Sequence, residues 1–148
     1  MSLPLKADTP EAPYRLEDQV GHLLRRAHQR ASAVFLETMA ELELTPTQYA
    51  ALVKIGDVGE ISQNHLGRLT AMDPATSQGV IRRLEARGLI ELRPDPSDRR
   101  RTLLRLSTAG HQLLPGAIGR GRAITAASLA PLDETEQATF LALLKRLT

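Results

Sequence analysis

Arginine is the residue type whose placement in this sequence most clearly suggests a chemical role. Residues 82–106 contain eight arginines against four acidic residues, a net charge of +4 in a chain whose total is +2. Arg99, Arg100 and Arg101 are consecutive, and three like charges in a row repel one another and gain nothing from a core. The segment therefore has the positive charge expected of a surface that binds a polyanion such as nucleic acid. A charged face that contacts only solvent is the alternative interpretation.

A predicted helix just before these arginines carries a second set of polar side chains. Asp73 fits its N-cap, Pro74 its first turn, and Gly88 its end. If Val80 and Leu84 face the core, a set of outward positions follows near its start. These positions are Ala75, Thr76, Gln78, Gly79, Arg82 and Arg83. Short hydrogen-bonding groups there can pair with base edges in a major groove, and the arginines one turn later suit phosphates. An ordinary polar surface is the alternative.

Helical periodicity dominates the sequence that must position these residues. Serine, threonine or aspartate precedes most of the predicted helices and fits the N-cap, where a side-chain oxygen accepts a backbone N–H. The predicted helices cover residues 16–40, 46–55, 63–70, 74–87, 108–129 and 134–147. Two of them, 63–70 and 74–87, are short and joined by a tight turn, which are the proportions of a helix-turn-helix.

The hydrophobic period changes after Gly88. Residues 89–93 and 102–106 have strand character, and residues 94–101 between them are rich in turn formers. We predict a β-hairpin with a long, arginine-tipped loop, in the position of a wing directly after the helix-turn-helix. The predicted fold class is mainly α with a small β-hairpin wing: a winged helix-turn-helix with helical extensions at both ends.

The terminal helices carry more apolar surface than one short helix can bury alone. The apolar residues concerned are Leu129, Leu132, Phe140, Leu141, Leu144 and Leu147. A symmetric homodimer would bury them and would place two recognition helices about one DNA turn apart. We predict one domain over residues 1–148, with a helical dimerisation region (16–44 and 107–148) and a winged helix-turn-helix DNA-binding region (45–106). Packing of the last helix on its own chain is the alternative.

Four stretches of the sequence together resemble the MarR (multiple antibiotic resistance regulator) family of bacterial transcription factors. They are residues 44–52, 66–69, 80–90, and 95–101 followed by 106–110. Each is a loose pattern, but all four occur in order and at the family spacing. The resemblance implies a homodimer that binds a palindromic operator in double-stranded DNA, acts as a repressor, and loses affinity when a small molecule binds. A winged-helix protein-interaction module that does not bind DNA specifically is the alternative function.

The resemblance also implies roles for individual residues. It places the recognition helix at 73–87 and the wing at 93–105, with an Asp-x-Arg pair at Asp98 and Arg100. In the family this arginine enters the minor groove and the aspartate braces it. Arg99 and Arg101 extend the basic wing. Arg68, on the preceding helix, could contact a phosphate or be an ordinary solvated arginine.

Residues 21–30 are similar to those of relatives that respond to aromatic acids or their thioesters. The candidates for binding such an effector are Arg25, Arg26, His28, Gln29 and Arg30. His28 and Arg30 lie about 80° to either side of the apolar stripe of the first predicted helix, where a neighbouring helix can half-bury them. An exposed polar face is the alternative.

Several function classes are excluded. The four histidines lack the i, i+4 spacing of a helical metal site, and no Gly-x-Ser-x-Gly or Walker motif occurs. Without cysteine there is no disulfide, no Cys-ligated zinc and no cysteine-based peroxide sensing, which some relatives use. The longest uncharged stretch, 106–119, is shorter than the about 20 apolar residues of a membrane span, and the N-terminus lacks a signal-peptide pattern. We expect a cytoplasmic regulator without catalytic residues, cofactor, metal or membrane partner.

Overall fold

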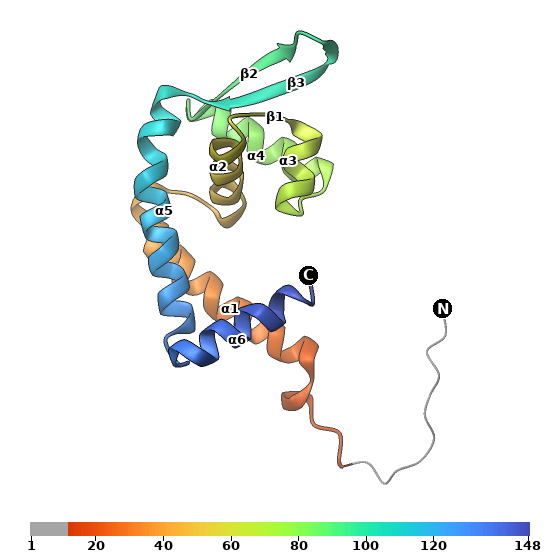
Figure 1. Cartoon of the computed structure of the whole chain (residues 1–148), viewed down its shortest axis with the longest axis vertical. Helices are drawn as coiled ribbons and strands as arrows, with labels where there is room; N and C mark the ends of the chain where they lie inside the picture. The colour runs from red at the N-terminus through yellow and green to blue at the C-terminus, as the bar shows by residue number, and fades with distance from the viewer. Residues whose placement is uncertain (1–11) are drawn as a thin grey trace, which may run out of the picture.

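The structure, a computed structural model, describes residues 12–148 and is mainly helical with one small antiparallel sheet (Figure 1). The helices are α1 (Val20–Met39), α2 (Pro46–Val58), α3 (Gln63–Thr70), α4 (Pro74–Ala86), α5 (Thr108–Leu129) and α6 (Glu134–Lys145). The strands are β1 (Glu60–Ser62), β2 (Ile90–Asp95) and β3 (Asp98–Leu106). Short 3₁₀ helices at Leu16–Asp18 and Ala40–Leu42 flank α1. This architecture confirms the predicted fold class.

The helix starts predicted from capping residues are present. Thr45 and Gln48 form a reciprocal capping box at α2, and Asp133 and Glu136 form another at α6. The hydroxyl of Ser62 accepts the backbone N–H of residue 65 at the start of α3. Each such bond satisfies a backbone donor that has no partner within its helix. These local interactions therefore set where the helices begin.

The core lies where α2, α3, α4 and the sheet meet. Leu52, Ile55, Leu66, Leu84 and Leu104 are fully buried there, and burial of such a side chain stabilises the fold by about 1.5–3 kcal/mol. Val80 and Ile81 are also buried, so α4 faces the core as predicted. The opposite side of α4 is left at the surface.

The sheet has the strand order β1-β3-β2, and both pairs are antiparallel. The predicted long loop of the hairpin is wrong: only Pro96 and Ser97 separate the two strands. Asp95 makes this tight turn because its Oδ1 accepts hydrogen bonds from the backbone N–H and the hydroxyl of Ser97, at 2.9 and 2.7 Å. The three consecutive arginines, 99–101, consequently lie on β3 rather than in a loop. Strand β1 was not predicted at all.

Helix α5 connects the sheet to the other end of the molecule. It runs along the side of the structure from β3 to α6 and packs against α1 (Figure 1). Helix α6 buries none of its own residues within the chain. No helix in the described part of the chain is both long and apolar enough to cross a membrane.

Candidate nucleic-acid interface

Helix α4 presents its polar residues to solvent at its N-terminal end. Thr76, Gln78, Arg82 and Arg83 are exposed, as is Ala75, and Gly79 is half-buried. Asp73 caps the helix by accepting the backbone N–H of Thr76 at 2.8 Å. This hydrogen bond holds the pKa of Asp73 below its usual value of 3.8. The orientation predicted for this helix is therefore observed, and its first turn can approach another molecule.

A close contact between α3 and α4 fixes the angle of the helix-turn-helix. A Cβ on Gly67 of α3 would lie 3.0 Å from the Ser77 hydroxyl and 3.1 Å from the Met72 carbonyl oxygen, so a larger residue would push the helices apart. The turn between them passes through Ala71 in the left-handed region, with φ of 53°. Arg68 follows Gly67 and is exposed. The turn thus fixes α4 relative to Arg68.

The wing is the hairpin of β2 and β3, and its arginines lie on the outer half of β3. Arg99, Arg100 and Arg101 are exposed. Asp98 does contact Arg100, but its Oδ1 accepts the backbone N–H of Arg100 at 3.0 Å. The aspartate therefore holds the backbone of the strand in this structure, and not the guanidinium group as the family resemblance implies.

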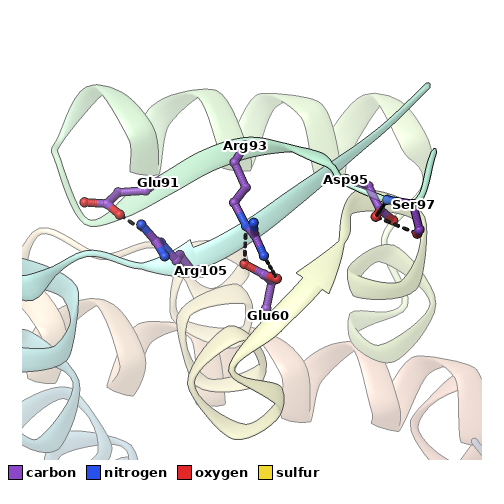
Figure 2. Close-up of polar contacts among 6 residues, drawn as sticks. All are labelled: Glu60, Glu91, Arg93, Asp95, Ser97 and Arg105. Atoms are coloured by element: carbon purple, nitrogen blue, oxygen red, sulfur yellow. Dashed lines mark hydrogen bonds and ion pairs between the residues drawn. The ribbon is translucent and has the colours of Figure 1, made fainter. Parts of the chain in front are cut away.

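Two ion pairs hold the base of the wing (Figure 2). Arg93 on β2 reaches across β3 to Glu60 on β1, with its Nε donating to Oε2 at 2.7 Å, and Arg105 on β3 pairs with Glu91 on β2 at 3.0 Å. Hydrogen bonds from Arg93 lower the pKa of Glu60 below its usual 4.5, and the same contact raises the pKa of Arg93. These two arginines are therefore engaged within the protein.

The remaining arginines of this surface have no such partner. Within residues 12–148, no ion pair involves Arg68, Arg82 or Arg83, nor any of the arginines 99–101. Their charges are consequently available to a ligand. They lie on three consecutive elements, α3, α4 and β3, of the winged helix-turn-helix.

Two residues at the start of α3 were missed by the sequence analysis. Gln63 and Asn64 line a hollow of about 200 Å³ together with Arg100 and Arg101 of the wing. They also line a larger hollow, of about 500 Å³, that continues along α3 to Pro74 and Ser77 of α4. They therefore connect the wing to the recognition helix. Their position directly after the N-cap Ser62 is the sequence signal that could have identified them.

The candidate effector residues on α1 are only partly brought together. His28 and Arg30 line a hollow of about 480 Å³ between α1 and the α5–α6 end, whereas Arg25, Arg26 and Gln29 do not line it. All five are exposed, so the expected half-burial of His28 and Arg30 is not observed. Arg30 donates to the backbone carbonyls of Ala127 and Ser128 at the end of α5, so its guanidinium group is already engaged. The other polar side chains of the hollow are His28, whose Nε2 lies 3.4 Å from the Ser32 hydroxyl, and Ser128, whose hydroxyl has no hydrogen-bond partner within residues 12–148.

The predicted dimerisation residues divide into two groups. Leu129 is buried within the chain, and Leu132 and Leu144 are half-buried. These three, together with Phe140, line the same hollow. Phe140, Leu141 and Leu147 are exposed. Packing against the chain itself thus accounts for part of the apolar surface, and the rest stays exposed within residues 12–148.

Comparisons with known proteins agree with this geometry. The MarR family model matches residues 42–101. The HTH-type transcriptional repressor NicR of Pseudomonas putida is 39% identical over 144 residues, covering 97% of this chain and 91% of NicR. The structure of a probable transcriptional regulator from Pseudomonas aeruginosa is 50% identical, with a TM-score of 0.87 over 90% of this chain and 100% of that chain. BpsR of Bordetella bronchiseptica, whose DNA binding is regulated by 6-hydroxynicotinic acid, is 38% identical, with a TM-score of 0.87 over 92% of this chain and 97% of BpsR. The chain belongs to the MarR family of transcriptional regulators.

Proposed function

We propose that this protein is a repressor that binds a palindromic operator as a homodimer and is released by a small aromatic acid. The observation that supports DNA binding most directly is the set of exposed arginines on α3, α4 and β3 that have no ion pair within residues 12–148, beside the exposed polar start of α4. In this proposal Thr76 and Gln78 contact base edges, with Ala75 and Gly79 allowing close approach. Arg68, Arg82 and Arg83 contact phosphates, and Arg100 enters the minor groove with Arg99 and Arg101 beside it.

The apolar surface at the other end of the molecule supports the homodimer. Phe140 and Leu141 on α6 are exposed, as are Leu147 just after it and Val20 and Leu23 on α1. Several large apolar side chains exposed on the terminal helices are typical of a surface that another subunit covers. We propose that residues 16–44 and 107–148 form the dimerisation region and that 45–106 form the DNA-binding region. Two-fold symmetry would then present one α4 to each half of a palindrome.

Selection from random double-stranded DNA followed by a salt titration tests this function. Enrichment of a palindrome, with an affinity that falls steeply between low and moderate salt, would support operator binding. Failure to enrich any sequence, together with salt-insensitive binding of another protein, would instead favour the protein-interaction module.

The effector part of the proposal is supported by the hollow between α1 and the α5–α6 end. Its lining is mostly apolar, which suits an aromatic ring, and His28 can pair with a carboxylate. BpsR, at 38% identity, responds to an aromatic acid of this type. We expect 6-hydroxynicotinic acid or a related acid to dissociate the protein from its operator. His28→Ala should raise the concentration required, whereas Arg26→Ala, on the same helix but outside the hollow, should not. Equal responses of both variants would place the effector elsewhere.

A further inference from the structure

The connection between α1 and α2 is held by two arginines that come from distant parts of the chain. Arg87, at the end of α4, donates from Nη1 to the carbonyl oxygen of Glu43 at 2.9 Å and from Nη2 to that of Leu42 at 3.0 Å. Arg120 of α5 donates to the carbonyl oxygen of Thr38 at 2.7 Å and also pairs with the Glu41 carboxylate. Residues 38–43, which we call the junction, are thus fixed from both sides.

The local backbone explains why the junction needs these donors. The last carbonyl groups of a helix have no N–H donor within that helix. The chain also reverses direction here through Glu43, whose φ of 52° lies in the left-handed region. A planar guanidinium group can donate to two successive carbonyls at once, whereas a lysine ammonium acts as a point charge. The arrangement therefore depends on arginine at position 87.

Arg87 also occupies a special place relative to the recognition helix. It is the C-cap residue of α4 and precedes Gly88, so its backbone is fixed to the end of that helix. Helix α4 packs mainly against α2, α3 and β2. The Arg87 hydrogen bonds thus connect the recognition helix to the 3₁₀ helix that follows α1 and to its C-cap Glu43, both within the proposed dimerisation region.

We propose that Arg87 is a positioning residue that holds the recognition helix at a fixed orientation relative to the dimerisation helices. The proposal rests on the proposed function, because a fixed orientation matters when two recognition helices must contact two half-sites at once. Without these hydrogen bonds the winged helix-turn-helix still folds, but its orientation relative to α1 varies more. The affinity for DNA that carries both half-sites then falls, whereas the affinity for a single half-site does not.

Binding of the selected operator and of DNA with a single half-site, measured for three variants, tests this role. Arg87→Gln should lose about tenfold or more in affinity for the full operator, with little change on the single half-site and an unchanged salt slope. Arg87→Lys, which can still supply one hydrogen bond, should lie between wild type and Arg87→Gln. Arg15→Gln is the matched control, since this arginine is exposed and lies outside both the proposed dimerisation region and the proposed DNA-binding region, so it should bind like wild type.

Other outcomes would overturn the proposal. Equal losses of affinity by Arg87→Gln for the full operator and the single half-site, with a salt slope lower by about one, would make Arg87 a phosphate ligand. Unchanged binding of both DNAs would show that the junction is held without Arg87.

Hydrogen exchange of the amides of residues 40–45 provides a readout that does not involve DNA. The exchange should accelerate in Arg87→Gln but not in Arg15→Gln, while exchange in the core of α2 stays the same. Failure of the wild type to bind any operator would contradict the proposed function, yet this comparison would still decide whether Arg87 holds the junction.

Discussion

Arg100 is the residue for which the charge distribution makes the sharpest prediction. It is exposed on β3, it has no ion pair within the described chain, and Asp98 holds its backbone amide. Arg100→Ala should weaken operator binding by about 1–3 kcal/mol and leave the helical circular dichroism spectrum unchanged. Fluorescence anisotropy with labelled operator measures this loss. Arg15→Ala removes the same charge from an exposed position outside both proposed regions and is the control; equal losses in both variants would show that only the total charge matters.

Gln78 and Arg82 should differ in the kind of loss that their removal causes. Gln78 lies exposed in the first half of α4, where its amide can pair with adenine, whereas Arg82 lies one turn later and suits a phosphate. Gln78→Ala should relax the sequence preference at one position of each half-site. Arg82→Ala should weaken all sequences about equally and lower the salt slope by about one. Sequence-preference profiles of the two variants check this, and an unaltered profile for Gln78→Ala would contradict the proposed orientation of α4 on DNA.

How much of the site could be predicted residue by residue depends on how local each interaction is. The N-caps and the exposed positions of α4 follow from residue types within one helical turn, and they are found where they were predicted. The partners of Arg30, Arg87 and Arg93 lie far away along the chain. No local pattern in the sequence indicates such pairs, so it did not show that Arg87, Arg93 and Arg105, three of the eight arginines of 82–106, are engaged within the protein.

At the scale of elements, the helices were predicted well and the sheet only in part: both strands of the hairpin were predicted, but their outer ends and β1 were not. The helices have a buried stripe that gives a periodic signal. The outer half of β3 has none, because residues 98–102 are all exposed, and alternation requires one buried face. Turn-forming residues therefore indicated a long loop where the structure has a tight turn. Strand β1, with three residues, is too short to show any period.

The ion pair at the base of the wing predicts an acid-dependent contribution to stability. The Glu60 pKa in the folded protein lies below its usual 4.5 because Arg93 donates to it. The pair therefore stabilises the fold above about pH 4.5 and is lost as the pH falls through the lowered value. The thermal unfolding midpoint of Glu60→Gln should be slightly lower than that of wild type at neutral pH, and the two should converge in acid. Glu37→Gln, on the exposed face of α1, is the control; a difference that persists at low pH would contradict the role of the charge.

At the scale of the whole molecule, the proposed homodimer is best tested at an apolar residue that the single chain leaves exposed. Leu144 is one of the interface residues predicted from the sequence, but it is half-buried and lines the hollow between α1 and the α5–α6 end. A substitution there would disturb the packing of the chain itself. Leu147, just after α6, is 69% exposed. Its contacts, if the proposed homodimer forms, come from the partner subunit, so it is the better position for a test of assembly.

Leu147→Asp should therefore dissociate the dimer without unfolding the chain. Burial of a leucine contributes about 1.5–3 kcal/mol, and two-fold symmetry counts each residue twice, so two buried charges should be strongly unfavourable. Ala142→Asp is the matched control, because Ala142 is exposed and lies roughly 160° from Phe140 and from Leu144 around α6. Sedimentation velocity at about micromolar concentration should show a monomer for Leu147→Asp and a dimer for Ala142→Asp. Operator affinity should fall only for Leu147→Asp, since one half-site offers too few contacts. An intact Leu147→Asp dimer would mean that the subunits meet elsewhere, and the exposed residues Val20 and Leu23 of α1 would then be the positions to substitute.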